Sequence, residues 1–298
     1  MLGLKEDSLD TQLIGNYEEG DLNHEIIEKF FRHRIEFNGG ILPVTNDDGI
    51  FNDEKEIASL ISEIAFDSIN RNFNADFSES PLAKTTLTSQ IPAITANILN
   101  FLHSFCKPQK KGFGNFTING VEEWFSTEAE GCSYSGKIDC ILNDGENFYI
   151  VDFKTGEPPA VKDCVLSENG SLSDFQIPLY MELWNKNNSP HKVENALFYS
   201  INKAASRFVV QPDCRKKGGQ KSAQEYEAVI DVMKDYTKVF CKKINASDFI
   251  PASDYADIYN NVDTYRHCKK CAFKTVCRTV FSIGNRPLKE AEQEGAEK

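Results

Sequence analysis

The segment that most constrains this chain is residues 136–156, GKIDCILNDGENFYIVDFKTG. Its two apolar, β-branched halves flank a turn sequence at residues 143–146, which predicts an antiparallel hairpin. Side chains alternate between the two faces of a strand. With a two-residue loop Asp139 lies diagonal to Asp152, and with a four-residue loop the two lie directly opposite each other. Both registers place Asp139, Asp152 and Lys154 on one face, and only a loop with an odd residue count separates them.

The two carboxylates of this hairpin predict a metal site. Carboxylates on adjacent strands repel each other, and their apolar strand neighbours imply partial burial, so the pair needs a compensating charge. A divalent cation supplies it, because carboxylate oxygens are the ligands that Mg²⁺ prefers. Lys154 can then orient a water or stabilise a developing oxyanion. The alternative is a solvated strand face that carries an ordinary Asp–Lys ion pair.

Charge and composition exclude several classes of protein. The 298 residues carry a net charge of −12, which argues against a uniformly basic coat for nucleic acid or anionic membranes but allows a local basic groove. No apolar run approaches the roughly 18 residues of a membrane span, and the N-terminus lacks the apolar core of a signal peptide. The nine cysteines then indicate reduced thiols or metal ligands. We expect a cytoplasmic protein with no membrane partner.

Hydrophobic periodicity predicts an α/β or α+β domain, in which helices flank a sheet with hairpin-connected strands. A helix begins at Gly20 with Asp21 or Asn23 as its cap, and Gly39-Gly40 ends it. The other expected segments are a lead-in over 1–19, a helical insertion over about 45–110, strands over 121–126, 137–142, 147–155, 195–202 and 207–211, helices over 174–184 and 222–244, and a flexible tail over 281–298.

Three further patterns contain residue types that bind metals or nucleic acid. His24 stands in the first turn of the expected N-terminal helix, where a packed or surface histidine is the alternative. Gln176 and Tyr180 are four residues apart and share one helix face, where an ordinary polar patch is the alternative. Residues 268–277 contain the spacing C-x2-C-x5-C, which is typical of zinc and iron–sulfur sites.

Taken in chain order, these motifs make the sequence similar to the PD-(D/E)xK nuclease superfamily. Asp139 followed by Asp152-Phe153-Lys154 resembles the D…(D/E)xK core, and GKID…IVDFKTG resembles the RecB-like branch, which includes AddB-type and CRISPR-associated exonucleases. Residues 20–24 resemble the G-x-x-x-H helix of that branch, 176–180 its QxxxY helix and 268–277 its closing cysteine motif. The resemblance covers about residues 20–280. It implies an α/β (α+β) restriction-endonuclease-like core, with a small mixed sheet flanked by helices and a helical insertion.

The resemblance also implies roles for individual residues. Lys154 would position or activate the attacking water, and Gln176 and Tyr180 would steer the strand being cut. Of the adjacent Glu122 and Glu123, Glu122 is the candidate that helps a second metal. The ligands of Mg²⁺ or Mn²⁺ would be His24, Asp139, Asp152 and the backbone carbonyl of Phe153.

The cysteine motif departs from the family in one respect. Cys268, Cys271 and Cys277 match three ligands of a 4Fe-4S cluster, but the fourth normally precedes the G-x-x-x-H helix, and residues 1–23 contain no cysteine. An incomplete or differently closed cluster and a zinc site both stay open.

The expected function is that of a metal-dependent DNA exonuclease in recombination and repair, with DNA as substrate and a helicase or recombination protein as partner. The alternative is a non-catalytic DNA-binding or scaffolding module of a larger helicase–nuclease. A zinc protein unrelated to DNA is the third possibility, and metal analysis separates it from the others.

Overall fold

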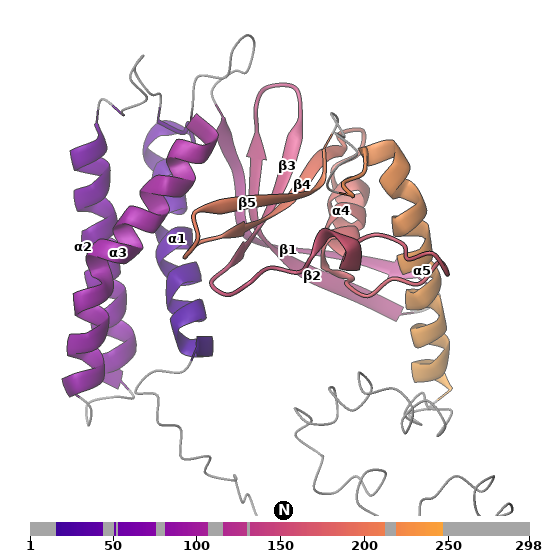
Figure 1. Ribbon diagram of the computed structural model, residues 1–298, viewed down its shortest axis with the longest axis horizontal. Helices are drawn as coiled ribbons and strands as arrows, with labels where there is room; N and C mark the ends of the chain where they lie inside the picture. Colours follow the sequence, from indigo (N-terminus) through magenta and orange to yellow (C-terminus); the bar gives the residue numbers. More distant parts are fainter. Residues whose placement is uncertain are drawn as a thin grey trace, which may run out of the picture. The chain divides into compact units, whose positions relative to one another are not determined.

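A five-stranded sheet with strand order β1-β2-β3-β4-β5 lies at the centre of the described structure (Figure 1). The computed structural model describes residues 16–43, 51, 53–75, 81–106, 116–129, 132–211 and 219–246. The chain divides into two compact units, Met1–Cys241 and Lys242–Lys298, and the sheet belongs to the first. The elements are α1 (Asn16–Asn38), α2 (Glu54–Ala75), α3 (Pro81–Cys106), β1 (Thr117–Ala129), β2 (Cys132–Asn143), β3 (Phe148–Lys154), a 3-10 turn η1 (Val161–Asp163), α4 (Gln176–Asn187), β4 (Val193–Ser200), β5 (Ala205–Val210) and α5 (Ala223–Asn245).

The sheet is mixed, which confirms the expected α/β architecture. Strands β1–β2, β2–β3 and β4–β5 pair antiparallel, whereas β3 and β4 pair parallel. A parallel pair needs a crossover connection, and α4 lies within the segment that joins β3 to β4. None of the described helices is long and apolar enough to cross a membrane.

The β2–β3 hairpin has the four-residue loop of the two registers considered. Pairing runs from Asn143↔Phe148 to Cys140↔Val151. Asp144 explains this loop length, because its buried carboxylate accepts hydrogen bonds from the backbone N–H groups of Glu146 (3.0 Å) and Asn147 (2.7 Å). The same carboxylate accepts the Tyr149 hydroxyl at 2.8 Å. The turn therefore sets which residues of β2 and β3 face each other.

Two separate apolar cores cover the two faces of the sheet. The first contains the inward faces of α1, α2 and α3 and alternate strand residues such as Val151 and Phe153. The second contains residues of α4 and α5 together with the intervening strand residues, such as Ile150 and Phe198. This alternation follows from the period of two along a strand. The sheet is thus a layer between α1–α3 on one side and α4–α5 on the other (Figure 1).

Helix α1 begins earlier than its sequence indicates. It starts at Asn16 rather than at Gly20, so His24 lies in its third turn and not in its first. Asn23 does not cap the helix, because its side-chain amide donates to the Glu19 carbonyl at 2.8 Å within the helix. Burial of apolar residues such as Leu22 and Ile26 outweighs the cost of about 1 kcal/mol for a glycine inside a helix.

The expected end of α1 at Gly39-Gly40 is confirmed. Both glycines have positive φ, 67° and 76°, a conformation that other residues rarely adopt. A Cβ on Gly40 would also lie 2.6 Å from the Ile118 carbonyl oxygen. Here α1 passes directly beside β1, which fixes the helix against the sheet.

The remaining expected elements are present, with shifted bounds. The expected helical insertion contains α2 and α3, and the strands of the first hairpin, β1 and β2, are longer than predicted. The lead-in up to residue 15, the cysteine motif over 268–277 and the tail over 281–298 lie outside the described residues.

Candidate active site

Asp139 and Asp152 meet where the pairing of β2 with β3 ends. The last pair is Cys140↔Val151. Asp139 directly precedes Cys140 on β2, and Asp152 directly follows Val151 on β3. Both are buried, with 8% and 1% of their surface exposed. The Phe153 backbone N–H donates to Asp139 Oδ2 at 2.8 Å. Both carboxylates line one cleft of about 240 Å³, which is also lined by His24, Phe153, Lys154, Thr155, Gly156, Glu157 and Gln176.

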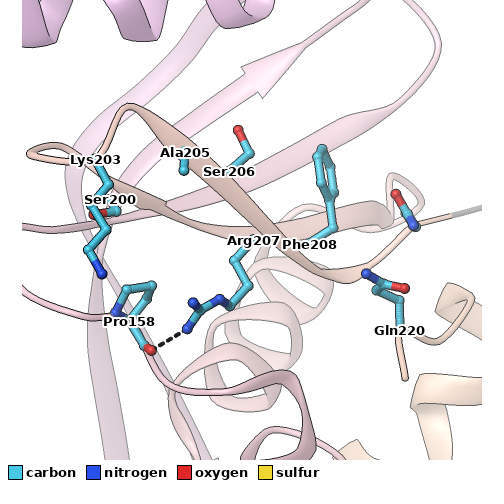
Figure 2. A pocket seen from close by; sticks show the side chains of 9 residues that line it. Pro158, Ser200, Lys203, Ala205, Ser206, Arg207, Phe208 and Gln220 are labelled. Carbon is cyan, nitrogen blue, oxygen red and sulfur yellow. Dashed lines mark hydrogen bonds between the residues drawn. The ribbon is translucent and has the colours of Figure 1, made fainter. Parts of the chain in front are cut away.

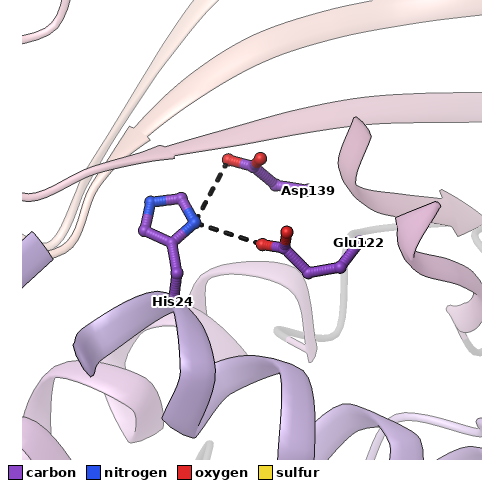
Figure 3. A group of neighbouring side chains, drawn as sticks. All are labelled: His24, Glu122 and Asp139. Carbon is purple, nitrogen blue, oxygen red and sulfur yellow. Dashed lines mark hydrogen bonds and ion pairs between the residues drawn. The ribbon is translucent and has the colours of Figure 1, made fainter. Parts of the chain in front are cut away.

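His24 and Glu122 complete a group with Asp139 that could hold a metal ion (Figure 3). His24 Nδ1 lies 3.2 Å from Glu122 Oε1 and 3.7 Å from Asp139 Oδ2. One ligand atom from each of the three residues lies within 4.8 Å of the others. Figure 3 shows His24 reaching from α1 toward the two carboxylates on β1 and β2. Of the two adjacent glutamates considered as candidates, it is Glu122 that joins the group.

The backbone of Glu122 is unusual. Its φ is 50°, in the left-handed region that non-glycine residues rarely occupy. Glu122 lies between the pairs Val121↔Cys140 and Glu123↔Ile138, opposite Asp139. Strain of this kind costs of the order of 1–3 kcal/mol and concentrates at functional sites. The neighbouring structure therefore holds Glu122 in a strained conformation beside Asp139.

On the other side of the cleft, the Gln176 amide joins three candidate residues. Its Nε2 donates to Asp152 Oδ1 at 2.6 Å and to the Tyr180 hydroxyl at 3.1 Å. Its Oε1 accepts a hydrogen bond from Lys154 Nζ at 2.9 Å. Lys154 Nζ also lies 2.8 Å from Asp152 Oδ2. The spacing of four residues on α4 thus brings Gln176 and Tyr180 together beside the Asp152–Lys154 pair.

Comparison with known families shows the superfamily to which the chain belongs. The model of the PD-(D/E)XK nuclease superfamily matches residues 2–278. The chain belongs to this superfamily. No curated protein matches the chain. The match covers nearly the whole sequence, and the mixed sheet between helices is consistent with the restriction-endonuclease-like fold of PD-(D/E)XK nucleases. These enzymes are metal-dependent nucleases.

The electrostatics of this candidate site fit a divalent cation. Burial, and next the Asp139 carboxylate, raise the pKa of Asp152 to about 7. Burial also raises the pKa of Asp139, despite the opposing effect of His24. Burial lowers the pKa of His24, but the Glu122 hydrogen bond and the Asp139 charge outweigh this and the net pKa is raised. These carboxylates are costly to ionise side by side, and a bound cation removes that cost.

Two features of the site are absent from the sequence prediction. Lys137 forms an ion pair with Glu122, and its position two residues before Asp139 on the same strand was the available signal. Burial raises the pKa of Glu122, but the hydrogen bonds from His24 and Lys137 outweigh it and the net pKa is lowered. The second feature is the Phe153 N–H, which donates to Asp139 Oδ2. The carbonyl of the same residue stays the metal ligand that the family resemblance implies.

Proposed function

We propose that this PD-(D/E)XK nuclease is a RecB-like deoxyribonuclease that hydrolyses phosphodiester bonds from DNA ends in recombination and repair. The observation that carries the proposal is the cleft in which Asp139, Asp152 and Lys154 converge. The order of the motifs along the chain supports the RecB-like assignment. A helicase or recombination protein would be the partner that presents the DNA end.

The metal ligands in this proposal are His24, Asp139, Asp152 and the Phe153 carbonyl, with Glu122 as the further acidic residue. Mg²⁺ or Mn²⁺ held there would supply charge neutralisation and an activated water for hydrolysis. The site suits such an ion because its oxygen donors are buried and their negative charges are only partly compensated.

Lys154 positions or activates the attacking water. Its Nζ is held from two sides, by Asp152 Oδ2 at 2.8 Å and by Gln176 Oε1 at 2.9 Å. These two contacts restrict the movement of the ammonium group. A group already held in place lowers the entropy cost of reaching the transition state. Gln176 and Tyr180 lie along the same edge of the site and would contact the strand being cut.

Digestion of end-labelled linear DNA tests this function. The parent protein, incubated with single- and double-stranded substrates and with Mg²⁺ or Mn²⁺, is expected to cleave. Asp139→Ala and Lys154→Ala should abolish cleavage. Asp231→Asn, which removes an exposed carboxylate on α5, is the matched control and should cleave like the parent. Circular DNA tests the requirement for an end.

Failure of the parent to cleave either substrate, when folded and supplied with metal, would refute the catalytic proposal. It would favour a DNA-binding or scaffolding module of a larger helicase–nuclease. Cleavage that survives Lys154→Ala would instead refute the role given to that lysine.

The cysteine motif at Cys268, Cys271 and Cys277 is proposed to hold a 4Fe-4S cluster or zinc, although it lies outside the described residues. Metal analysis of the purified protein should find iron with acid-labile sulfide in the first case and zinc alone in the second. A Cys271→Ser variant should lose that metal. A preparation with neither metal would refute the assignment.

A further inference from the structure

A second pocket lies against the edge strand β5, beside the candidate active site. It has a volume of about 350 Å³, and the lining residues that matter here are Pro158, Ser200, Lys203, Arg207 and Gln220 (Figure 2). Resting on the proposed function, we propose that this pocket binds a phosphate group of the substrate strand, together with its nucleotide, next to the cleavage site.

The position of the pocket is the first argument. In the parallel register of β3 and β4, Lys154 is the partner of Ser200, and in the antiparallel register of β4 and β5, Phe198 is the partner of Arg207. Alternation along each strand therefore places Lys154, Ser200 and Arg207 on the same face of the sheet. Two strand spacings and an offset of two residues along the strand, together about 12 Å, separate the backbones of Lys154 and Arg207. At a rise of about 3.4 Å per nucleotide, a strand covers this distance in about three to four nucleotides.

The loop after β3 forms the boundary between the two sites. Glu157 lines the active-site cleft, and Pro158, the next residue, lines the second pocket. A strand that leaves the cleft past Glu157 thus enters the pocket directly. The two sites are parts of one continuous path over the catalytic face of the sheet.

The charges of the pocket are arranged for an anion with two oxygens. Arg207 Nη2 lies 2.6 Å from Glu157 Oε1, and Lys203 Nζ forms an ion pair with the other carboxylate oxygen. Arg207 Nη1 also donates to the Pro158 carbonyl (Figure 2) and to the Pro159 carbonyl, which orients the guanidinium group. The two cations therefore converge on one carboxylate, as they would on a phosphate. Glu157 is exposed and can be displaced by a stronger anion.

A buried hydroxyl that lacks a partner is the second, independent observation. Ser200 is only 2% exposed and lines the pocket, yet within the described part of the chain its Oγ has no hydrogen-bond partner. Such a group costs free energy unless a ligand or water satisfies it. Gln220 adds an amide, the kind of group that contacts a base edge.

Fluorescence anisotropy with a labelled single strand of about 12 nucleotides tests the proposal in EDTA, where the metal cannot support cleavage. Lys203→Ala should weaken binding about 3–10-fold and lower the slope of log K against log salt by about 0.7, the value for one lost phosphate contact on a single strand. Glu157→Gln should tighten binding several-fold, because it removes the competing carboxylate.

A second exposed pair provides matched controls. Lys192 and Glu227 form an ion pair with similar exposure, outside both sites. Lys192→Ala and Glu227→Gln carry the same charge changes and should bind the strand like the parent. If Lys203→Ala and Glu157→Gln behave like these controls while the parent still cleaves DNA in Mg²⁺, the inference is overturned and the proposed function stands.

Two other results also decide the question. Weaker binding by Glu157→Gln would show that the cluster only braces the loop, which overturns the inference. A parent that neither binds nor cleaves DNA would overturn the proposed function and the inference with it. Thermal unfolding of each variant identifies one that has lost its fold. In that case Lys203→Gln, which removes the charge but keeps the stem, replaces Lys203→Ala.

Discussion

Replacing Asp152 with asparagine should stabilise the metal-free protein at pH 8. Burial and the Asp139 charge raise the pKa of Asp152 to about 7, against about 3.9 in an unfolded chain. At 1.36 kcal/mol per pKa unit, the ionised carboxylate costs the folded state about 4 kcal/mol relative to the protonated form. An asparagine carries no charge, and its Oδ1 can still accept the Gln176 hydrogen bond.

The direction of the pH dependence follows from the linkage between protonation and folding. Because the folded-state pKa is raised, the stabilising contribution of the protonated carboxyl is fully present below about pH 4 and is lost as the pH rises through about 7. The raised pKa of His24 acts in the same direction, since its contribution is present below the unfolded pKa of 6.5 and is lost above its folded pKa. The metal-free parent should therefore be less stable at pH 8 than at pH 5.

Asp152→Asn should raise the free energy of unfolding by less than the cost of the ionised carboxylate, because the variant also loses the ion pair with Lys154. We expect about 1–2 kcal/mol at pH 8, which corresponds to roughly 2–6 °C in Tm, and little change at pH 5. Thermal unfolding followed by circular dichroism in EDTA measures both. Mg²⁺ or Mn²⁺ at 100 times its Kd should then stabilise the parent by about 2.7 kcal/mol and the variant by much less.

A loss of stability in Asp152→Asn at pH 8, measured in EDTA, would refute this reasoning. It would mean that the carboxylate stabilises the empty site instead of straining it. Asp231→Asn, which removes an exposed carboxylate, should leave the Tm unchanged at both pH values and is the control.

Three further outcomes are expected. His24→Ala should weaken Mn²⁺ binding at least about tenfold in calorimetric titration, because it removes the only imidazole of the described metal-ligand group. Gln176→Leu, which removes the amide between Asp152 and Lys154, should lower kcat about 10–100-fold with a smaller change in KM in steady-state cleavage assays. Asp144→Ala should cost about 2–3 kcal/mol in urea unfolding, since the buried carboxylate accepts hydrogen bonds from two backbone N–H groups and from the Tyr149 hydroxyl in the hairpin. Burial raises the pKa of Asp144, but those hydrogen bonds lower it on balance, so the loss should shrink as the pH falls through the folded-state value.

The β2–β3 hairpin shows which features of the site can be predicted from the sequence and which cannot. Period-two alternation limited the register to two arrangements of Asp139 and Asp152, and either one brought the carboxylates near each other. The choice between them depends on Asp144, whose carboxylate closes a four-residue loop by accepting backbone N–H groups. An aspartate at the start of a turn was visible in the sequence, but its burial beneath Tyr149 was not.

Other features depend on contacts between distant segments. The start of α1 was misplaced because Gly20 has low helix propensity, while the packing that overrides it comes from the sheet and from α2 and α3. The positive φ of Glu122 could not be predicted, because glutamate has no preference for that conformation. The Gln176 bridge likewise requires the docking of α4 on the sheet, although its spacing to Tyr180 was evident.

The two apolar cores have a consequence for how this enzyme acquires its activity. His24 comes from α1, which packs in the first core, whereas Gln176 begins α4, which packs in the second. The first core alone places His24 beside Asp139, and the second alone places the Gln176 amide beside Lys154. The complete group of side chains therefore requires both cores, and a substitution that loosens either core disturbs the candidate site from one side.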